Sequence, residues 1–222
     1  MYNVGKLSRI APQYPFLTWG IVMLALLGSF PCFAKTEFRR YINGSLGTQQ
    51  FNVKNDVSTN AGLSFKKVYP YSIEVGIIQG SVFSYGLRVD YIQHTREKTI
   101  NSAVQSIRYT QVPVMVVWGL NFGETIVFRP NIALGYALVD TFTVINSASA
   151  DNGVYETSNA LATAGADLYV LAGGEIKIGL LLSAGYKFQD ILKYGKSDSP
   201  GISFNSSGHQ GYYWAVGGAL RF

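Results

Sequence analysis

Nine ionisable residues lie in segments whose alternate positions are apolar. They are Glu74, Arg88, Asp90, Arg129, Asp167, Glu175, Lys177, Lys187 and Arg221. Successive side chains of a strand point to opposite faces, so these groups are expected to share the inner face of a sheet with an apolar outer face. Buried charges must pair, because an isolated one is costly. If the sheet closes around an interior, the set predicts an ion-pair network that fills this lumen. A hydrated pore or proton path lined by the same groups is the alternative.

A second group has the residue types needed for nucleophilic catalysis. Ser206, Ser207 and His209 lie close together in the sequence, and a serine next to a histidine is the usual pairing. A dyad or triad also needs a third group that orients the histidine. These serines lie in a segment of generic Gly, Asn and Ser composition. We therefore interpret the chain as non-enzymatic, with a lipid-modifying barrel enzyme as the least favoured alternative.

The sequence has no pattern typical of phosphate, metal, thiol or nucleic-acid chemistry. The sequence has no Gly-rich phosphate loop on a strand–helix unit and no His, Asp and Glu spacing typical of a metal site, so no cofactor or metal is expected. Its one cysteine, Cys32, belongs to the N-terminal segment discussed next. The net charge of +5 falls to +3 without Lys6 and Arg9, which is too weak and scattered to indicate nucleic acid.

The N-terminus has the features of a secretory signal. Lys6 and Arg9 precede the mostly apolar, uncharged run 16–30, which is shorter than the ~20 residues of a spanning helix. Small residues then predict cleavage between Ala34 and Lys35. We expect residues 1–34 to be a Sec-type signal peptide and 35–222 the mature domain; an uncleaved anchor is the alternative.

The other end of the chain predicts how that domain ends. Tyr212, Trp214, Val216, Leu220 and Phe222 share one face of a strand whose other face is small or polar. A strand that is apolar outside and stops on an aromatic residue suits the closing strand of a transmembrane barrel. These five residues are the predicted assembly signal.

Eight segments carry strand patterns. They are 39–51, 69–79, 83–93, 104–121, 125–141, 155–171, 175–190 and 211–222. Short turns follow the second, fourth and sixth, whereas long loops are expected at 52–68, 94–101, 146–153 and 193–208. Pro113 predicts a bulge or local break. Residues 60–67 suit a ninth strand, but bacterial barrels have even strand numbers, so we assign them to the first loop or to an extension of the second strand.

The predicted fold is thus all-β, an eight-stranded antiparallel up-and-down transmembrane β-barrel. Its glycines and aromatic residues suit a barrel with interfacial girdles. The segments 41–47, 129–136, 182–188 and 218–222 make the chain similar to the superfamily of small outer-membrane β-barrels. That superfamily includes the opacity-type surface proteins and the transmembrane domain of the outer membrane protein A type.

The resemblance implies a multi-pass protein of the outer membrane of a Gram-negative bacterium. It implies contact with outer-membrane lipid and lipopolysaccharide, insertion by the barrel-assembly machinery, and a structural or adhesin-like role, with a host or surface ligand bound through four long extracellular loops. A narrow channel or porin is the alternative function. No periplasmic domain follows the last strand, so a peptidoglycan-binding domain is not expected.

Overall fold

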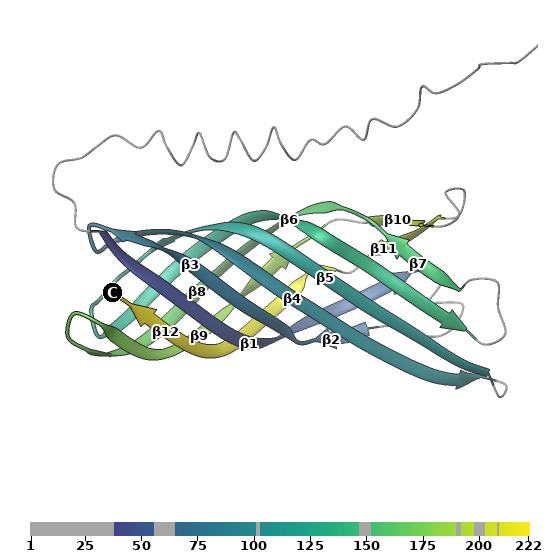
Figure 1. Cartoon of the computed structure of the whole chain (residues 1–222), viewed down its shortest axis with the longest axis horizontal. Helices are drawn as coiled ribbons and strands as arrows, with labels where there is room; N and C mark the ends of the chain where they lie inside the picture. Colours follow the sequence, from purple (N-terminus) through teal and green to yellow (C-terminus); the bar gives the residue numbers. More distant parts are fainter. Residues whose placement is uncertain are drawn as a thin grey trace, which may run out of the picture. The chain divides into compact units, whose positions relative to one another are not determined.

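The computed structural model describes residues 38–55, 65–100, 103–146, 152–189, 192–197, 203–207 and 209–222. The predicted signal peptide and its cleavage site lie outside these residues. The strands of the described part are β1 (Phe38–Asn55), β2 (Phe65–Val68), β3 (Pro70–Gln79), β4 (Phe83–Ile100), β5 (Ala103–Leu120), β6 (Ile126–Asn146), β7 (Gly153–Glu156), β8 (Asn159–Gly173), β9 (Lys177–Phe188), β10 (Leu192–Lys196), β11 (Ser203–Ser207) and β12 (Gly211–Arg221) (Figure 1). No helix among the described residues is long and apolar enough to cross a membrane.

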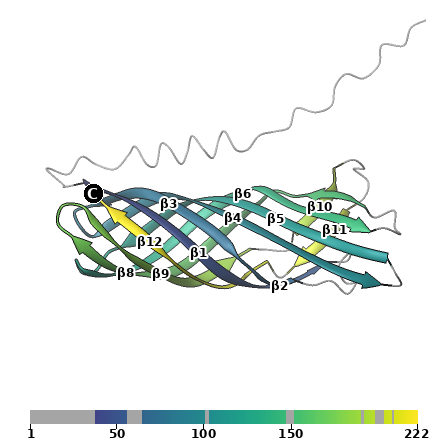
Figure 2. The same cartoon turned by 60° about the horizontal axis from the view of Figure 1, so that its bottom comes forward.

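Eight of these strands close into a barrel. The ring runs β1–β3–β4–β5–β6–β8–β9–β12 and returns to β1, with every pairing antiparallel (Figures 1 and 2). One path of paired residues round it is Arg39, Ile78, Ser84, Gly119, Asn131, Gly165, Gly185, Tyr213 and Gln49. The path leaves β1 at Arg39 and returns at Gln49, so the strands are staggered and tilt, as a closed barrel requires. The prediction of an eight-stranded antiparallel barrel is confirmed.

The four remaining strands lengthen the barrel wall at the end away from the C-terminus (Figures 1 and 2). β7 pairs with β6, β10 with β7, and β11 with both β10 and the last residues of β1. β2 pairs with β1, and only Tyr69 separates it from β3. The part of 60–67 that the structure describes therefore extends the second strand. We call this section, built by β2, β7, β10, β11 and the ends of β1, β4, β5 and β6, the outer extension.

The outer extension corrects three predicted loops, the first of them at residues 52–55, which continue β1. Residues 94–100 continue β4 and pair with β5 as far as Ile100 opposite Ala103. Much of the predicted loop 193–208 forms β10 and β11, which pair with each other. Their polar side chains made these segments look like loops. In a barrel wall that projects into water, however, polar residues on the outer face are compatible with strand pairing.

Below the outer extension, the outer face of the ring is apolar. Ile73, Leu87, Ile132, Leu182 and Val216 are all outward and exposed, as are many of their neighbours on the same face. Such a continuous exposed apolar surface marks a membrane contact rather than a surface meant for water. Outward tyrosines border it: Tyr71 pairs with Tyr91, and Tyr186 with Tyr212. We call the apolar surface the belt and these tyrosines the girdle.

The last strand faces as predicted. Tyr212, Trp214 and Val216 are outward and exposed, whereas Ala215 and Ala219 are buried in the interior. Phe222 exchanges two backbone hydrogen bonds with Arg40, with N···O distances of 2.6 and 2.9 Å. The terminal residue therefore takes part in closing the ring.

Pro113 lies opposite a bulge, as predicted. Val112 pairs with Val139, but Pro113 pairs with Ala137, so Leu138 is an extra residue in β6. An extra residue reverses the alternation of faces. Beyond Leu138 the inward residues are therefore Asp140, Phe142 and Val144, all of which are buried.

Candidate functional site: the barrel interior

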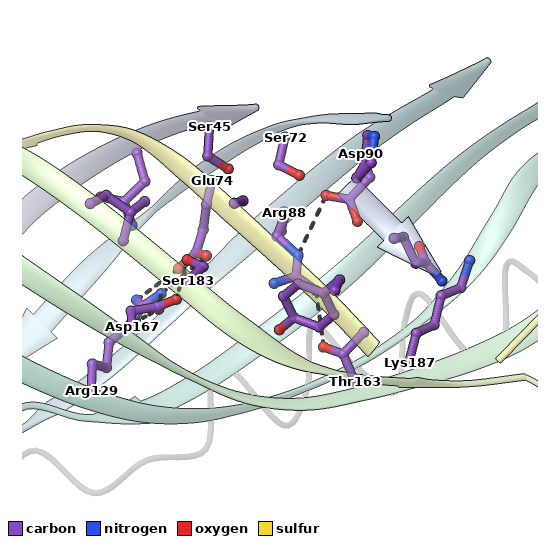
Figure 3. Close-up of a pocket in the computed structure, with 16 residues that line it drawn as sticks. Ser45, Ser72, Glu74, Arg88, Asp90, Arg129, Thr163, Asp167, Ser183 and Lys187 are labelled. Carbon is purple, nitrogen blue, oxygen red and sulfur yellow. Dashed lines mark hydrogen bonds and ion pairs between the residues drawn. The ribbon is translucent and has the colours of Figure 1, made fainter. Parts of the chain in front are cut away.

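Strands β3, β6 and β8 bring three charged side chains together inside the belt. The Arg129 guanidinium donates to Glu74 at 2.8 and 3.2 Å, and to Asp167 at 2.8 and 2.6 Å. All three side chains are buried, with Arg129 only 2% exposed. The contact with Glu74 is bidentate, with one guanidinium nitrogen on each carboxylate oxygen, whereas both hydrogen bonds to Asp167 go to Oδ2. Charge-assisted pairs of this kind are stronger than neutral hydrogen bonds. We call these residues the Arg129 cluster (Figure 3).

Neutral groups complete the cluster, in which two carboxylates face one guanidinium. Tyr41 donates to Glu74 at 2.6 Å, and Asn131 and Ser183 donate to Asp167 at 2.9 and 2.5 Å. The rings of Tyr41 and Tyr169 lie 5.3 and 5.5 Å from the guanidinium carbon. Hydroxyl and amide donors stabilise the second carboxylate in place of a second cation.

A cavity of about 50 Å³ separates this cluster from a second charged group. Arg88 lies 3.5 Å from Asp90 and donates to Thr163 at 2.9 Å, and Lys187 also lines the cavity (Figure 3). Its six charged lining residues, three of each sign, are Glu74, Arg88, Asp90, Arg129, Asp167 and Lys187. A space of this size holds a few water molecules at most. The balanced charge gives it no preference for an ion of either sign.

The other three predicted lumen residues are Glu175, Lys177 and Arg221. They lie near the end of the barrel where a short turn joins β8 to β9. Glu175 lies in the turn between β8 and β9 and is exposed, so its assignment to the lumen is wrong: the strand pattern was extended two residues too far. Lys177 is half-buried at the start of β9 and donates to the Glu124 carbonyl at 3.3 Å. Arg221, also half-buried, donates to Asn121 at 3.2 Å.

A polar network that the sequence did not reveal lies at the start of the outer extension. Asp140 accepts hydrogen bonds from Gln111 at 2.6 Å, Asn159 at 2.8 Å and Tyr194 at 2.5 Å. Lys187 donates to Gln111, which joins this network to the cavity side of the lumen. Burial raises the pKa of the Asp140 carboxyl, and the surrounding donors oppose that shift. Strict alternation along β6 would have placed Asp140 outward. The bulge at Leu138 turns Asp140 inward. Two features of the sequence indicate this reversal: Pro113, which predicts a bulge, and the apolar residues Phe142 and Val144 beyond it.

Beyond Asp140 the lumen is filled by an apolar and aromatic core. This aromatic plug consists of Val68, Ile92, Ile107, Tyr109, Phe142, Val144, Tyr155 and Tyr194. The Phe142 ring lies 4.8 Å from Tyr109 and 4.8 Å from Tyr194, measured between ring centroids. Each side chain of the plug is at most 2% exposed. The barrel interior is therefore closed by packed side chains at this level.

His209, which follows the predicted loop 193–208 in the sequence, lies among the aromatic rings of the plug. It is fully buried, and its Nδ1 lies 3.5 Å from the Tyr109 hydroxyl. Burial, aided by the positive charge of Lys187, lowers the pKa of the imidazole to about 3. Ser206 and Ser207 lie on β11, opposite Asn55 and Lys54 of β1; their side chains lie outside the described residues. A neutral histidine enclosed by aromatic rings has no access to an external substrate.

The closed eight-stranded ring, its apolar belt and its polar interior decide the architecture. The fold is that of the small outer-membrane β-barrels. In the part of this barrel that the structure describes, no three His, Cys, Asp or Glu side chains come together as metal ligands would.

Several solved structures are similar to this barrel at low sequence identity. The outer membrane protein OprG from Pseudomonas aeruginosa is 8% identical, with 84% of this chain and 97% of that chain covered and a TM-score of 0.49. Ail, the attachment invasion locus protein of Yersinia pestis, in complex with the heparin analogue sucrose octasulfate, is 13% identical, with 83% and 98% covered and a TM-score of 0.45. Neisserial surface protein A is 8% identical, with 83% and 95% covered and a TM-score of 0.43. No family model and no curated protein matches the sequence.

Proposed function

We propose that this protein is a non-conducting, non-enzymatic barrel of the Gram-negative outer membrane. Its role is structural or adhesin-like, and the interacting surface is the outer extension with its loops. The observation that carries this proposal is the interior, which is filled by side chains at three successive levels: the Arg129 cluster, the Asp140 network and the aromatic plug.

The filled interior argues against the channel alternative. A conducting path needs a continuous water column, whereas the cavity beside the Arg129 cluster has a volume of about 50 Å³. Its charged neighbours are held by one another: Arg129 by two carboxylates, and Arg88 by Asp90. Opening such a path would expose or separate buried ion pairs, which is costly.

The outer extension supports the surface role. Paired strands continue the wall beyond the girdle, and this part of the barrel has its own buried core. Its outward side chains include Gln93, Thr95, Arg108 and Asn205, which are polar and exposed. A firmly held polar rim suits the recognition of a partner outside the cell, because little ordering is needed on binding.

Two measurements test the proposal. The purified protein, refolded into planar bilayers, should show near-zero conductance while its heat-modifiable mobility on gels confirms the folded barrel. Bacteria carrying the protein should adhere to an epithelial layer more than bacteria carrying a variant with Gln93, Arg108 and Asn205 changed to Glu. Steady, ion-selective conductance would contradict the closed lumen. Equal adhesion of the two strains, at equal surface amounts, would contradict the adhesin-like role.

Export belongs to the same proposal. We expect the Sec-type signal to be removed between Ala34 and Lys35, followed by insertion by the barrel-assembly machinery into the lipopolysaccharide-bearing membrane. N-terminal sequencing of protein from outer-membrane fractions should begin at Lys35. A mature chain that still begins at Met1 would show that the segment is an uncleaved anchor.

A further inference from the structure

A groove of about 440 Å³ opens on the outer face of the barrel beside the girdle. Leu134 of β6, Ala160 and Ala162 of β8, Phe188 of β9, and Gln189 and Gln210 line it. None of these lining side chains is charged. Leu161, which points into the barrel and is 4% exposed, also lines the groove.

The groove lies where the described pairing between β8 and β9 ends. β8 and β9 pair only as far as Ala162 opposite Phe188. Pairing across the same two chain segments resumes between β7 and β10, at Glu156 opposite Gly195. Among the described residues, no strand pairing joins the two segments between these points, and Leu161 lies in this stretch. The described β8–β9 ladder thus ends next to the groove, where the inward-facing Leu161 is among the lining residues.

The chemistry of the lining selects an apolar occupant. Gln189 lies at the inner end, where its amide nitrogen donates to Asn159 and, at 3.4 Å, to Asp140. Its polar end is thus engaged by the interior network, and Ala160, Ala162, Leu134 and Phe188 present hydrocarbon to the groove. A phosphate or another anion has no cation to pair with among these residues.

The position of the groove identifies where the occupant comes from. Phe188 packs against Tyr186, with centroids 4.8 Å apart, and Tyr186 against Tyr212 at 4.9 Å. Tyr186 and Tyr212 belong to the girdle, where the hydrocarbon of a membrane meets its headgroups. The groove is continuous with the belt at Leu134, and the exposed Gln210 lines it from the chain segment just before β12.

We propose that this groove binds one acyl chain of a membrane lipid, with the lipid headgroup near Gln210. The proposal rests on the placement of the barrel in a membrane. A chain seated there would cover the end of the described β8–β9 ladder and exclude water from Leu161. Lipid at this place would then be a bound ligand, whereas lipid elsewhere on the belt exchanges freely.

Photo-crosslinking tests the proposal with the full chain refolded into phosphatidylethanolamine–phosphatidylglycerol vesicles. The probe is a phosphatidylethanolamine with a diazirine on one acyl chain, and mass spectrometry locates the labelled peptides. Peptides containing Ala160–Ala162 and Phe188 should be labelled roughly tenfold above other belt peptides, the ratio that about 1.4 kcal/mol of preference gives. Ala162→Trp should remove the excess by filling the groove.

Ala172→Trp is the matched control, because Ala172 is also exposed on β8 but does not line the groove. It should keep the excess labelling, as should any variant that leaves the groove open. Heat-modifiable mobility establishes that each variant folds, and Ala160→Leu replaces Ala162→Trp if that variant does not. Even labelling along the whole belt would contradict a lipid-binding site at the groove, but it would agree with the placement of the barrel in a membrane. Absence of label from the entire belt would overturn both.

Discussion

The Arg129 guanidinium holds the Glu74 carboxylate across the lumen, through hydrogen bonds of 2.8 and 3.2 Å between strands that are not neighbours in the ring. The pair therefore joins opposite parts of the wall. Both side chains are buried, so the contact is shielded from competing water. Its strength and its cost when broken follow from this burial.

Replacing Arg129 should destabilise the barrel strongly. Arg129→Ala leaves Glu74 and Asp167 buried without their cation, and the free energy of unfolding should fall by about 3–5 kcal/mol. Conductance should stay near zero, because the aromatic plug remains. Urea titration in lipid vesicles measures the first quantity and planar-bilayer recording the second. Arg108→Ala, at an exposed position, should change stability by less than about 0.5 kcal/mol. Unchanged stability with a new ion-selective current would instead indicate a working channel.

An arginine on the belt should be costly, whereas the same change beyond the girdle should not. Leu182 is 51% exposed on β9, and Leu182→Arg should lower the free energy of unfolding by about 2–4 kcal/mol, the penalty near a bilayer midplane. Ile145, 57% exposed on the outer extension, provides the control, and Ile145→Arg should be nearly neutral. Equal costs for the two in the same urea titration would show that the belt is misplaced.

Truncating the centre of the aromatic plug should loosen the outer extension. Phe142 is fully buried between Tyr109 and Tyr194, so Phe142→Ala should cost about 3–5 kcal/mol. Hydrogen exchange should accelerate in β7, β10 and β11, and the belt strands should keep their protection. Ile145→Ala, on the opposite face of the same strand, is the control. Faster exchange in the belt alone would mean that the plug does not support the outer extension.

His209 should make the protein less stable in acid. Its pKa falls to about 3 in the folded state, below the ordinary value of about 6.5. The stabilisation that the neutral His209 side chain provides is complete above pH 6.5. It is lost as pH falls towards 3, because only the unfolded chain takes up the proton. The free energy of unfolding then falls by about 1.4 kcal/mol per pH unit. Asp140, whose pKa is raised, contributes in the opposite sense. His209→Phe removes this titrating group. In urea titrations between pH 7 and 4, the variant should therefore lose less stability per pH unit than the unchanged protein. An identical slope in the two proteins would mean that His209 is protonated when folded.

Removing Phe222 should impair assembly. Its backbone closes the ring through two hydrogen bonds with Arg40, and its side chain is exposed at the end of the belt. The chain lacking Phe222 should be depleted from the outer-membrane fraction and found degraded or aggregated in the periplasm. Phe222→Trp, which keeps a terminal aromatic residue, should assemble normally. Normal outer-membrane amounts of the shortened chain would rule out an assembly role.

Period-two alternation let the sequence predict the ring. Where one face meets lipid and the other a packed interior, every second residue is constrained, and this pattern fixed the eight strands and the outward face of Trp214 and Leu182. The same rule placed Arg129, Glu74 and Asp167 inward. It could not pair them, because partners across the lumen depend on the stagger of the closed ring and not on the spacing within one strand.

Only the tertiary structure decided what lies beyond the girdle. Polar outward residues such as Thr95 and Asn205 erase the hydrophobic alternation, so the end of β4 and the strands β10 and β11 looked like loops. One extra residue at Leu138 then exchanged the faces of β6 and turned Asp140 and Phe142 inward. His209 joined them because residues far apart in the chain converge inside the barrel. The sequence determines which segments alternate; closure, stagger and a single bulge decide which side chains meet.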